Sequence, residues 1–212
     1  MKVKLITTIS DQSHPGWKTL ERSLIKFGWD YDVMQSDYHG FGTKMVNAYN
    51  YAKTTDCTHL FIVDAYDVVV LGTMSEALEK LGNKDMVWNA EKAAWPYEQW
   101  GMLYPEVDSE WKYLNGGACF VEVKKFIQML DDYPIMPTDN DQVVLAATYI
   151  VDRNSYGMSL DTACKAFQSY AHIADDDYAY RDGRLWNIKN ETCPVIIHGN
   201  GHTDMSKIIE LI

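Results

Sequence analysis

Segments whose apolar residues are spaced as in a β-strand alternate along this chain with segments whose apolar residues are spaced as in an α-helix. This order limits the folds that the chain can form. Val3–Ile9 is rich in β-branched residues, and residues 17–27 then carry apolar side chains at helical spacing before Gly28. Further helices are expected over residues 43–53, 75–81, 124–130 and 141–149, and further strands over 59–63, 85–89, 111–123 and 194–198. Ser75 is a candidate cap for the helix that it begins. We therefore predict an α/β fold in which helices cover a mostly parallel sheet.

The length and composition favour one globular unit. Domains cluster near about 100–200 residues, and this chain has 212. Its longest apolar runs, residues 60–63 and 68–71, are far shorter than the ~20 residues that span a bilayer. We expect a single domain over residues 1–212, with no membrane anchor.

Charge and cysteine usage exclude several kinds of partner. The formal net charge of −11 disfavours binding to nucleic acid or to anionic lipid, because both are negatively charged. The apolar stretch at the N-terminus is too short for a signal peptide, so we expect a cytoplasmic protein. The cysteines stand singly and are expected to be reduced thiols rather than zinc ligands: Cys57, Cys119, Cys164 and Cys193.

An apolar strand ends abruptly on two acids in the segment Phe61-Ile-Val-Asp-Ala-Tyr-Asp67. In open α/β sheets, ligands bind beyond the carboxyl ends of the strands. A divalent cation held there by carboxylates would neutralise a diphosphate leaving group. Asp64 and Asp67 are therefore candidate metal ligands, and the alternative is that they are turn-forming acids at a strand end.

A second apolar strand, residues 194–198, ends on His198 and is followed by Gly199-Asn-Gly201. An imidazole is a plausible third metal ligand, and glycines allow backbone N–H groups to approach a phosphate. A purely structural histidine is the alternative. We expect Asp64 and His198 to come from neighbouring strands of the central sheet, at one edge of a cleft.

Other segments carry groups that suit sugar hydroxyls. The glycines Gly116 and Gly117 lie within a predicted strand and would allow a sugar to lie against the backbone. As alternatives, Asp139 or Asp141 caps the following helix, and Trp95 belongs to the core. The candidate hydrogen-bonding side chains are Glu91, Asn115, Asp141 and Gln142.

Taken together and in this order, these segments resemble the glycosyltransferase domain of the multifunctional procollagen lysyl hydroxylases. The matching stretches are residues 42–44, 61–68, 89–96, 104–105, 114–117, 139–142, 160–161, 166–168 and 198–201. They cover most of the chain from Gly40 onward. The resemblance implies a GT-A glycosyltransferase fold, that is, a single Rossmann-like α/β/α sandwich, together with a UDP-sugar donor and Mn²⁺.

The resemblance also implies roles for individual residues. The metal ligands would be Asp64, Asp67 and His198, and Tyr66 would lie against the uridine. The donor-binding residues would be Lys44, Asp64, Tyr66, Asn115, Gly116, Gly117, Asn200 and Gly201. The candidate catalytic residues, which would border the sugar and the acceptor, are Glu91, Trp95, Asn140, Asp141 and Gln142. The chain differs from the family pattern at Asn140, which interrupts a run of aspartates, and at residues 202–204, which contain no lysine.

The predicted function is Mn²⁺-dependent transfer of a sugar from a UDP-sugar, such as UDP-glucose, to a hydroxyl acceptor. The acceptor is expected to be a protein side chain, a glycan or a modified base. Nucleic acid is expected as a partner only in the form of such a modified base. Two alternatives use the same groups. One is a metal-dependent sugar-nucleotide hydrolase or nucleotidyltransferase, and the other is a non-catalytic relative that binds UDP-sugar.

Overall fold

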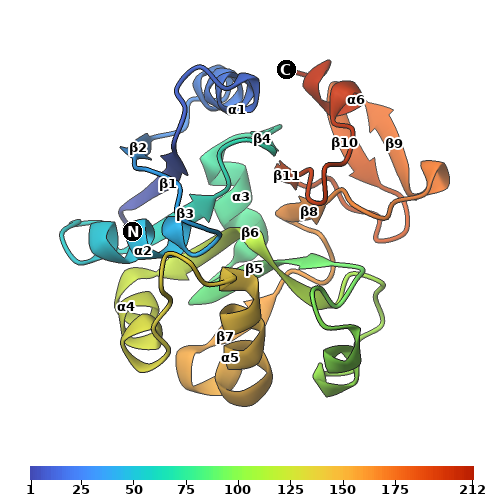
Figure 1. Ribbon diagram of the computed structural model, residues 1–212. Coiled ribbons are helices and arrows are strands. Elements are labelled where there is room, and N and C mark those ends of the chain that lie inside the picture. The colour runs from blue at the N-terminus through green and yellow to red at the C-terminus, as the bar shows by residue number, and fades with distance from the viewer.

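A six-stranded sheet forms the centre of the molecule (Figure 1). The computed structural model describes the backbone of residues 1–212 and every side chain except that of Asp175. All strands of the sheet run parallel except β6, which pairs antiparallel with both of its neighbours. In spatial order the strands are β2 (Tyr31–Gln35), β1 (Val3–Ile9), β3 (His59–Val63), β6 (Tyr113–Glu122), β5 (Met86–Glu91) and β7 (Met158–Leu160). The predicted mostly parallel sheet is confirmed.

Helices cover both faces of this sheet, because successive strand residues point to opposite sides. Leu5 of β1 packs in a cluster with Trp17, whereas its neighbour Ile6 packs in a second cluster with Met45. The first face is covered by α1 (Pro15–Lys26) and α3 (Met74–Leu81), and the second by α2 (Thr43–Ala52), α4 (Val123–Asp132) and α5 (Asp141–Tyr156). The result is the α/β/α sandwich expected for a Rossmann-like fold.

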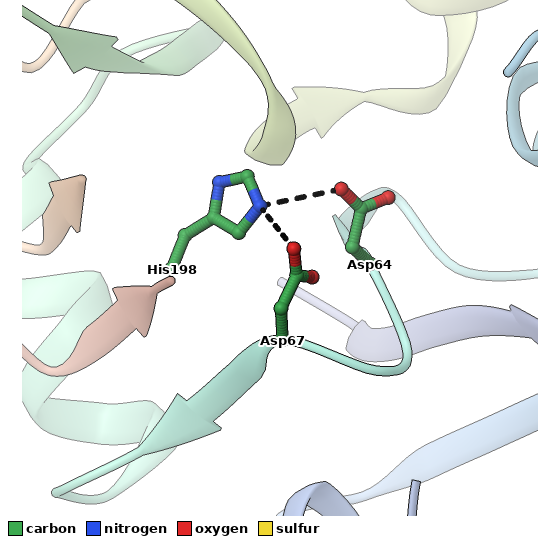
Figure 2. A group of neighbouring side chains, drawn as sticks. All are labelled: Asp64, Asp67 and His198. Atoms are coloured by element: carbon green, nitrogen blue, oxygen red, sulfur yellow. Dashed lines mark ion pairs between the residues drawn. The ribbon is translucent and has the colours of Figure 1, made fainter. Parts of the chain in front are cut away.

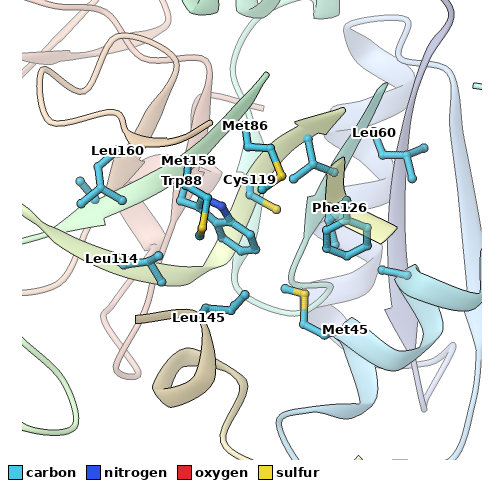
Figure 3. Packing of buried hydrophobic residues seen from close by; sticks show 14 of the residues in the cluster. Met45, Leu60, Met86, Trp88, Leu114, Cys119, Phe126, Leu145, Met158 and Leu160 are labelled. Atoms are coloured by element: carbon cyan, nitrogen blue, oxygen red, sulfur yellow. The ribbon is translucent and has the colours of Figure 1, made fainter. Parts of the chain in front are cut away.

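The larger cluster lies between the sheet and α2, α4 and α5. Figure 3 shows Trp88 of β5 among apolar side chains that include Met45 of α2 and Leu145 of α5. Trp88 and Phe126 are fully buried. Burial of a large side chain contributes roughly 1.5–3 kcal/mol, so these contacts fix the helices against the sheet that carries the site.

A second, three-stranded sheet contains His198. Its strands are β4 (Val68–Val70), β11 (Ile196–His198) and β8 (Phe167–Ser169). β11 runs antiparallel to β4 and parallel to β8. Ile196 and Ile197 belong to opposite apolar clusters, so the small sheet continues both layers of the core.

The prediction that Asp64 and His198 come from neighbouring strands of the central sheet is therefore wrong. Asp64 follows β3, whose two edges are already paired with β1 and β6. No edge of β3 is left for the strand that carries His198. That strand instead pairs with β4, which begins directly after Asp67.

The remaining elements are short. They are the hairpin β9 (Tyr178–Arg181) and β10 (Arg184–Asn187), the 3₁₀ helices η1 (Glu98–Leu103) and η2 (Asp175–Asp177), and α6 (Ser206–Ile209). Thr73, rather than the predicted Ser75, caps α3, and its Oγ1 accepts a hydrogen bond from the N–H of Glu76 at 3.2 Å. Within the described part of the chain, every helix is too short or too polar to cross a bilayer.

Candidate active site

A cavity of about 490 Å³ opens at the edge of the central sheet where β3 and β5 end and β6 begins. Most of the residues predicted for the site line it. They are Lys44, Asp64, Asp67, Glu91, Trp95, Asn115, Gly116, Gly117, Asp141, Gln142, His198, Asn200 and Gly201. Tyr66 and Asn140 are not among its lining residues. The two sheets thus bring together side chains that lie far apart in the sequence.

Asp64, Asp67 and His198 converge on one point of this cavity (Figure 2). The Nε2 atom of His198 lies 3.4 Å from Oδ2 of Asp64 and 3.3 Å from Oδ2 of Asp67. One ligand atom from each residue lies within 4.8 Å of the others. Two carboxylates and an imidazole at this spacing could share a single cation.

Backbone hydrogen bonds hold the two acids beside the histidine. The N–H of Asp64 donates to the carbonyl oxygen of Gly117 at 2.8 Å, which joins the end of β3 to β6. The N–H of Gly199 donates to the carbonyl oxygen of Asp67 at 2.7 Å, which joins the loop after β11 to the start of β4. The three candidate ligands are therefore fixed by bonds between the segments that carry them.

Asn115 determines which nitrogen of His198 faces the acids. Its Oδ1 accepts hydrogen bonds from the N–H of Gly117 at 3.0 Å and from Nδ2 of Asn89 at 3.1 Å. The same oxygen lies 2.8 Å from Nδ1 of His198, so Nδ1 is the donor. The lone pair of Nε2 then points toward Asp64 and Asp67, which is the arrangement typical of a histidine that binds a metal.

Gly117 is required by the position of the imidazole. A Cβ atom at this position would lie 1.9 Å from Cε1 of His198, far inside van der Waals contact. At Gly116 the nearest atom to an added Cβ is Cβ of Gln142 at 3.6 Å, an ordinary contact. The second glycine of the pair therefore makes room for the candidate metal ligand.

The charges of the cluster are coupled. Burial disfavours protonation of His198, but the Asp67 and Asp64 carboxylates outweigh burial and raise the pKa of the imidazole. Burial would raise the pKa of Asp67, but His198 and Lys44 lower it below its ordinary value. The two carboxylates thus favour a positive charge at Nε2 of His198, the atom that faces them.

Lys44 neutralises the opposite side of the cluster. Its Nζ lies 2.6 Å from Oδ1 of Asp64, 2.6 Å from the carbonyl oxygen of Gly116 and 3.6 Å from Oδ2 of Asp141. Burial disfavours the ammonium, but the Asp64 and Asp141 carboxylates outweigh it and raise the pKa of Lys44. The lysine is therefore charged and already paired.

A network of amides surrounds Glu91. Its Oε1 accepts from Nε2 of Gln142 at 2.6 Å, and its Oε2 accepts from Nδ2 of Asn200 at 2.8 Å. Gln142 in turn accepts from the N–H of Gly116 through Oε1 at 3.0 Å. Burial raises the pKa of the Glu91 carboxyl. The network joins the start of α5, the end of β5 and the loop after β11 around the cavity.

Asp141 lies at the first position of α5 and faces the cavity. Burial raises the pKa of its carboxyl, an effect that Lys44 opposes. Neither alternative capping residue acts as the N-cap, which is Asn140. Asp139 instead accepts from the N–H of Met136 at 2.7 Å. Among the described residues, Oδ1 of Asn140 is buried and has no hydrogen-bond partner.

Aromatic side chains flank the cavity. Trp95 is 48% exposed and packs edge-on against Phe41, with ring centroids 6.3 Å apart, so it is not a core residue. Tyr66 turns instead toward the loop after β1, where its Oη accepts from the N–H of Ser10 and of Asp11, each at 2.8 Å. Tyr66 is therefore held against the loop after β1 and does not line the cavity.

The structure adds residues that the sequence did not indicate. Phe41, His172 and His202 line the cavity, and none of them belongs to a periodic apolar segment. Their loops carry no motif that separates them from ordinary turns. The one signal in the sequence is that His202 directly follows Gly201, a predicted site residue.

Comparisons with known proteins show the family of the chain. A sequence model of the family described as "PLOD GT domain" matches residues 1–209. The human multifunctional procollagen lysine hydroxylase and glycosyltransferase LH3 is 29% identical over 164 residues, covering 73% of this chain and 22% of that protein. The Drosophila melanogaster procollagen-lysine,2-oxoglutarate 5-dioxygenase is 31% identical over 154 residues, covering 68% and 21%. The chain thus spans about a fifth of the length of these relatives.

A solved structure shows the same fold. It is a glycosyltransferase involved in the glycosylation of the major capsid of PBCV-1, with a TM-score of 0.55 and 10% sequence identity. The similarity covers 99% of this chain and 98% of that one. The α/β architecture predicted from the sequence is therefore that of a known glycosyltransferase.

Proposed function

The chain belongs to the family of PLOD GT domains, a glycosyltransferase family, and on this premise we propose that it transfers a sugar from a UDP-sugar to a hydroxyl acceptor with the help of Mn²⁺. The observation that carries the proposal is the convergence of Asp64, Asp67 and His198 in a polar cavity at the end of β3.

The residues present fit a divalent cation. Hard cations prefer carboxylate oxygens, and a set with two carboxylates and one imidazole suits Mn²⁺ better than Zn²⁺, for which sulfur or several histidines would be expected. The hydrogen bond from Nδ1 of His198 to Asn115 supports the role of Nε2 as a ligand. When bound, the cation would neutralise the charge that develops on the departing diphosphate.

The other cavity residues would position the two substrates. Asp141 offers a buried carboxylate, which suits it to accept a hydrogen bond from a sugar or acceptor hydroxyl. Glu91 would hold Asn200 and Gln142 in place through the bonds described above. Trp95 and Phe41 would cover the reacting groups and limit the access of water.

The acceptor is proposed to be a protein side chain or a glycan that carries a free hydroxyl. A modified base is the alternative acceptor, and the net charge of −11 disfavours it. No membrane partner is proposed.

The test is to incubate the protein with a panel of UDP-sugars in Mn²⁺, with and without chelator, and to measure UDP together with the fate of the sugar. Transfer predicts metal-dependent UDP release and a glycosylated product when a hydroxyl acceptor is present. Free sugar regardless of acceptor would identify a hydrolase, and a new nucleotide-sugar would identify a nucleotidyltransferase. UDP binding without turnover of any donor would identify a non-catalytic relative.

A further inference from the structure

Two exposed histidines that line the cavity have an unusual backbone conformation. His172 has φ 57° and His202 has φ 60°, both in the left-handed region. Only a few per cent of residues other than glycine adopt this region, and such residues cluster at functional sites because local strain persists only where the surroundings enforce it. Both side chains border the cavity that contains the candidate metal ligands.

The strands before the two histidines are parallel neighbours. β8 and β11 pair in register, with Ser169 opposite His198, so the loops that follow leave the sheet side by side. Each loop then places a left-handed histidine on the cavity, His172 three residues after Ser169 and His202 four residues after His198.

Asn200 joins these two loops. Its Oδ1 accepts from Oγ of Ser169 at 2.7 Å and from the N–H of Ala171 at 3.1 Å. Its carbonyl oxygen accepts from Oγ1 of Thr203 at 2.7 Å. Asn200 thus bonds to the residues just before His172, and its bond to Thr203 spans His202. The two loops therefore form one unit that carries both histidines.

The cavity is rich in carboxylates and poor in basic side chains, so its exposed histidines are additional N–H donors for an anion. Among its lining residues, the described side chains include the carboxylates Asp64, Asp67, Glu91 and Asp141, and Lys44 as the one lysine or arginine. Lys44 is buried and already bound to Asp64 and to the carbonyl of Gly116. A diphosphate that entered this acidic cavity would be stabilised by further N–H donors beside a divalent cation.

We infer that His172 and His202 bind the diphosphate of the donor, one from each loop, each donating an imidazole N–H to a phosphate oxygen. The inference rests on the proposed function, because it assigns residues to the donor of that same reaction. His202 also lines a neighbouring hollow with Tyr66 and Asp67, so it borders both the cavity of the candidate metal ligands and the hollow that contains the tyrosine assigned to uridine.

The experiment compares UDP with uridine, which lacks the diphosphate, by titration calorimetry in Mn²⁺. The variants are His172→Asn, His202→Asn and the double variant, because Asn accepts the left-handed conformation but is too short to replace the imidazole. The matched control is His39→Asn, an exposed histidine that is not a lining residue of the cavity. Unfolding temperature and Mn²⁺ affinity are recorded for each protein, and His→Gly variants, which also suit the conformation, replace any that misfold.

Each single substitution is expected to weaken UDP binding about 3- to 10-fold, the loss of one hydrogen bond, and the double variant more, with Mn²⁺ and uridine affinities unchanged. Equal UDP affinity in the wild type and the double variant would overturn the inference while leaving the proposed function intact. An equal loss for UDP and uridine would also overturn it, because the histidines would then act through the fold. Failure of the wild type to bind UDP at all would contradict the proposed function itself, and the inference with it.

Discussion

Asp67 and Asp141 lie in the same cavity, but removing the charge of each is expected to lower activity for a different reason. Asp67 is a candidate metal ligand 3.3 Å from His198, so Asp67→Asn should weaken both Mn²⁺ and UDP binding. Asp141 is proposed to bind a sugar or acceptor hydroxyl rather than the diphosphate, so Asp141→Asn should leave UDP affinity nearly intact and lower transfer by about 10²-fold or more. UDP titration and sugar-transfer rates on both variants separate the two roles. A normal rate for Asp141→Asn would remove it from the reacting groups.

The glycine pair supplies a second test at single residues. Gly117→Ala would place a methyl group on the imidazole of His198, so the ring must move and Mn²⁺ affinity should fall at least about 10-fold. Gly116→Ala adds the same methyl group one residue away, where only ordinary contacts are met, and Mn²⁺ affinity should be retained. Metal titration of the two variants decides the matter. Equal affinities would show that the contact between Gly117 and His198 does not position a ligand.

Residues of the site differ in how well the sequence predicts them. Asp64 and His198 could be predicted because each ends an apolar strand, a pattern visible without a structure. Their roles as metal ligands stay predictions. His172 and Phe41 could not be predicted, because their loops have no period. The loop of His172 reaches the cavity through the pairing of β8 with β11.

At the scale of elements, an ion-pair network joins the end of β5 to η2. Asp177 is fully buried, and its carboxylate lies 2.7 Å from Nζ of Lys92 and 2.8 Å from Nζ of Lys189. Both lysines also pair with Glu110, each at 2.7 Å. Lys92 directly follows Glu91 of the cavity, so the network holds this edge of the site against the C-terminal hairpin.

The network predicts a particular dependence of stability on pH. Burial opposes ionisation of Asp177, but its hydrogen bonds to Lys189 and Lys92 outweigh burial and lower the pKa to about 2. A pKa lowered by folding stabilises the native state above the unfolded value near 4, and this stability is lost as the pH falls toward 2. Asp177→Asn should therefore lower the free energy of unfolding by up to about 2 kcal/mol at pH 7 and by much less at pH 2. Urea unfolding of both proteins across this range tests it, and a difference that is constant with pH would contradict it.

The length of an element decides how well the sequence predicts it. β1 and β3 were predicted with their observed bounds, because five or more β-branched or apolar residues give a clear signal. β4 and β8 have three residues each, too few to show a period, and their pairing with β11 is a tertiary property. This is why the position of His198 outside the central sheet was missed.

For the whole molecule, the site lies at the junction of two sheets, and ligands that bind there should stabilise the native state. A ligand at 100 times its dissociation constant adds about 2.7 kcal/mol, which for a chain of this size is a shift of roughly 5–10 °C in unfolding temperature. We expect this shift with Mn²⁺ and UDP together, and a much smaller one with either alone. Thermal scans of the wild type and Asp67→Asn test it. An equal shift in the variant would place the metal elsewhere.

The most direct test of the account is the affinity for UDP, measured by titration calorimetry on the wild-type protein in Mn²⁺ and again in excess chelator. If Asp64, Asp67 and His198 hold a cation that binds the diphosphate, UDP should bind at least about 10-fold more weakly without the metal, because the acids of the cavity would then face the phosphates directly. The same affinity in chelator and in Mn²⁺ would contradict the account.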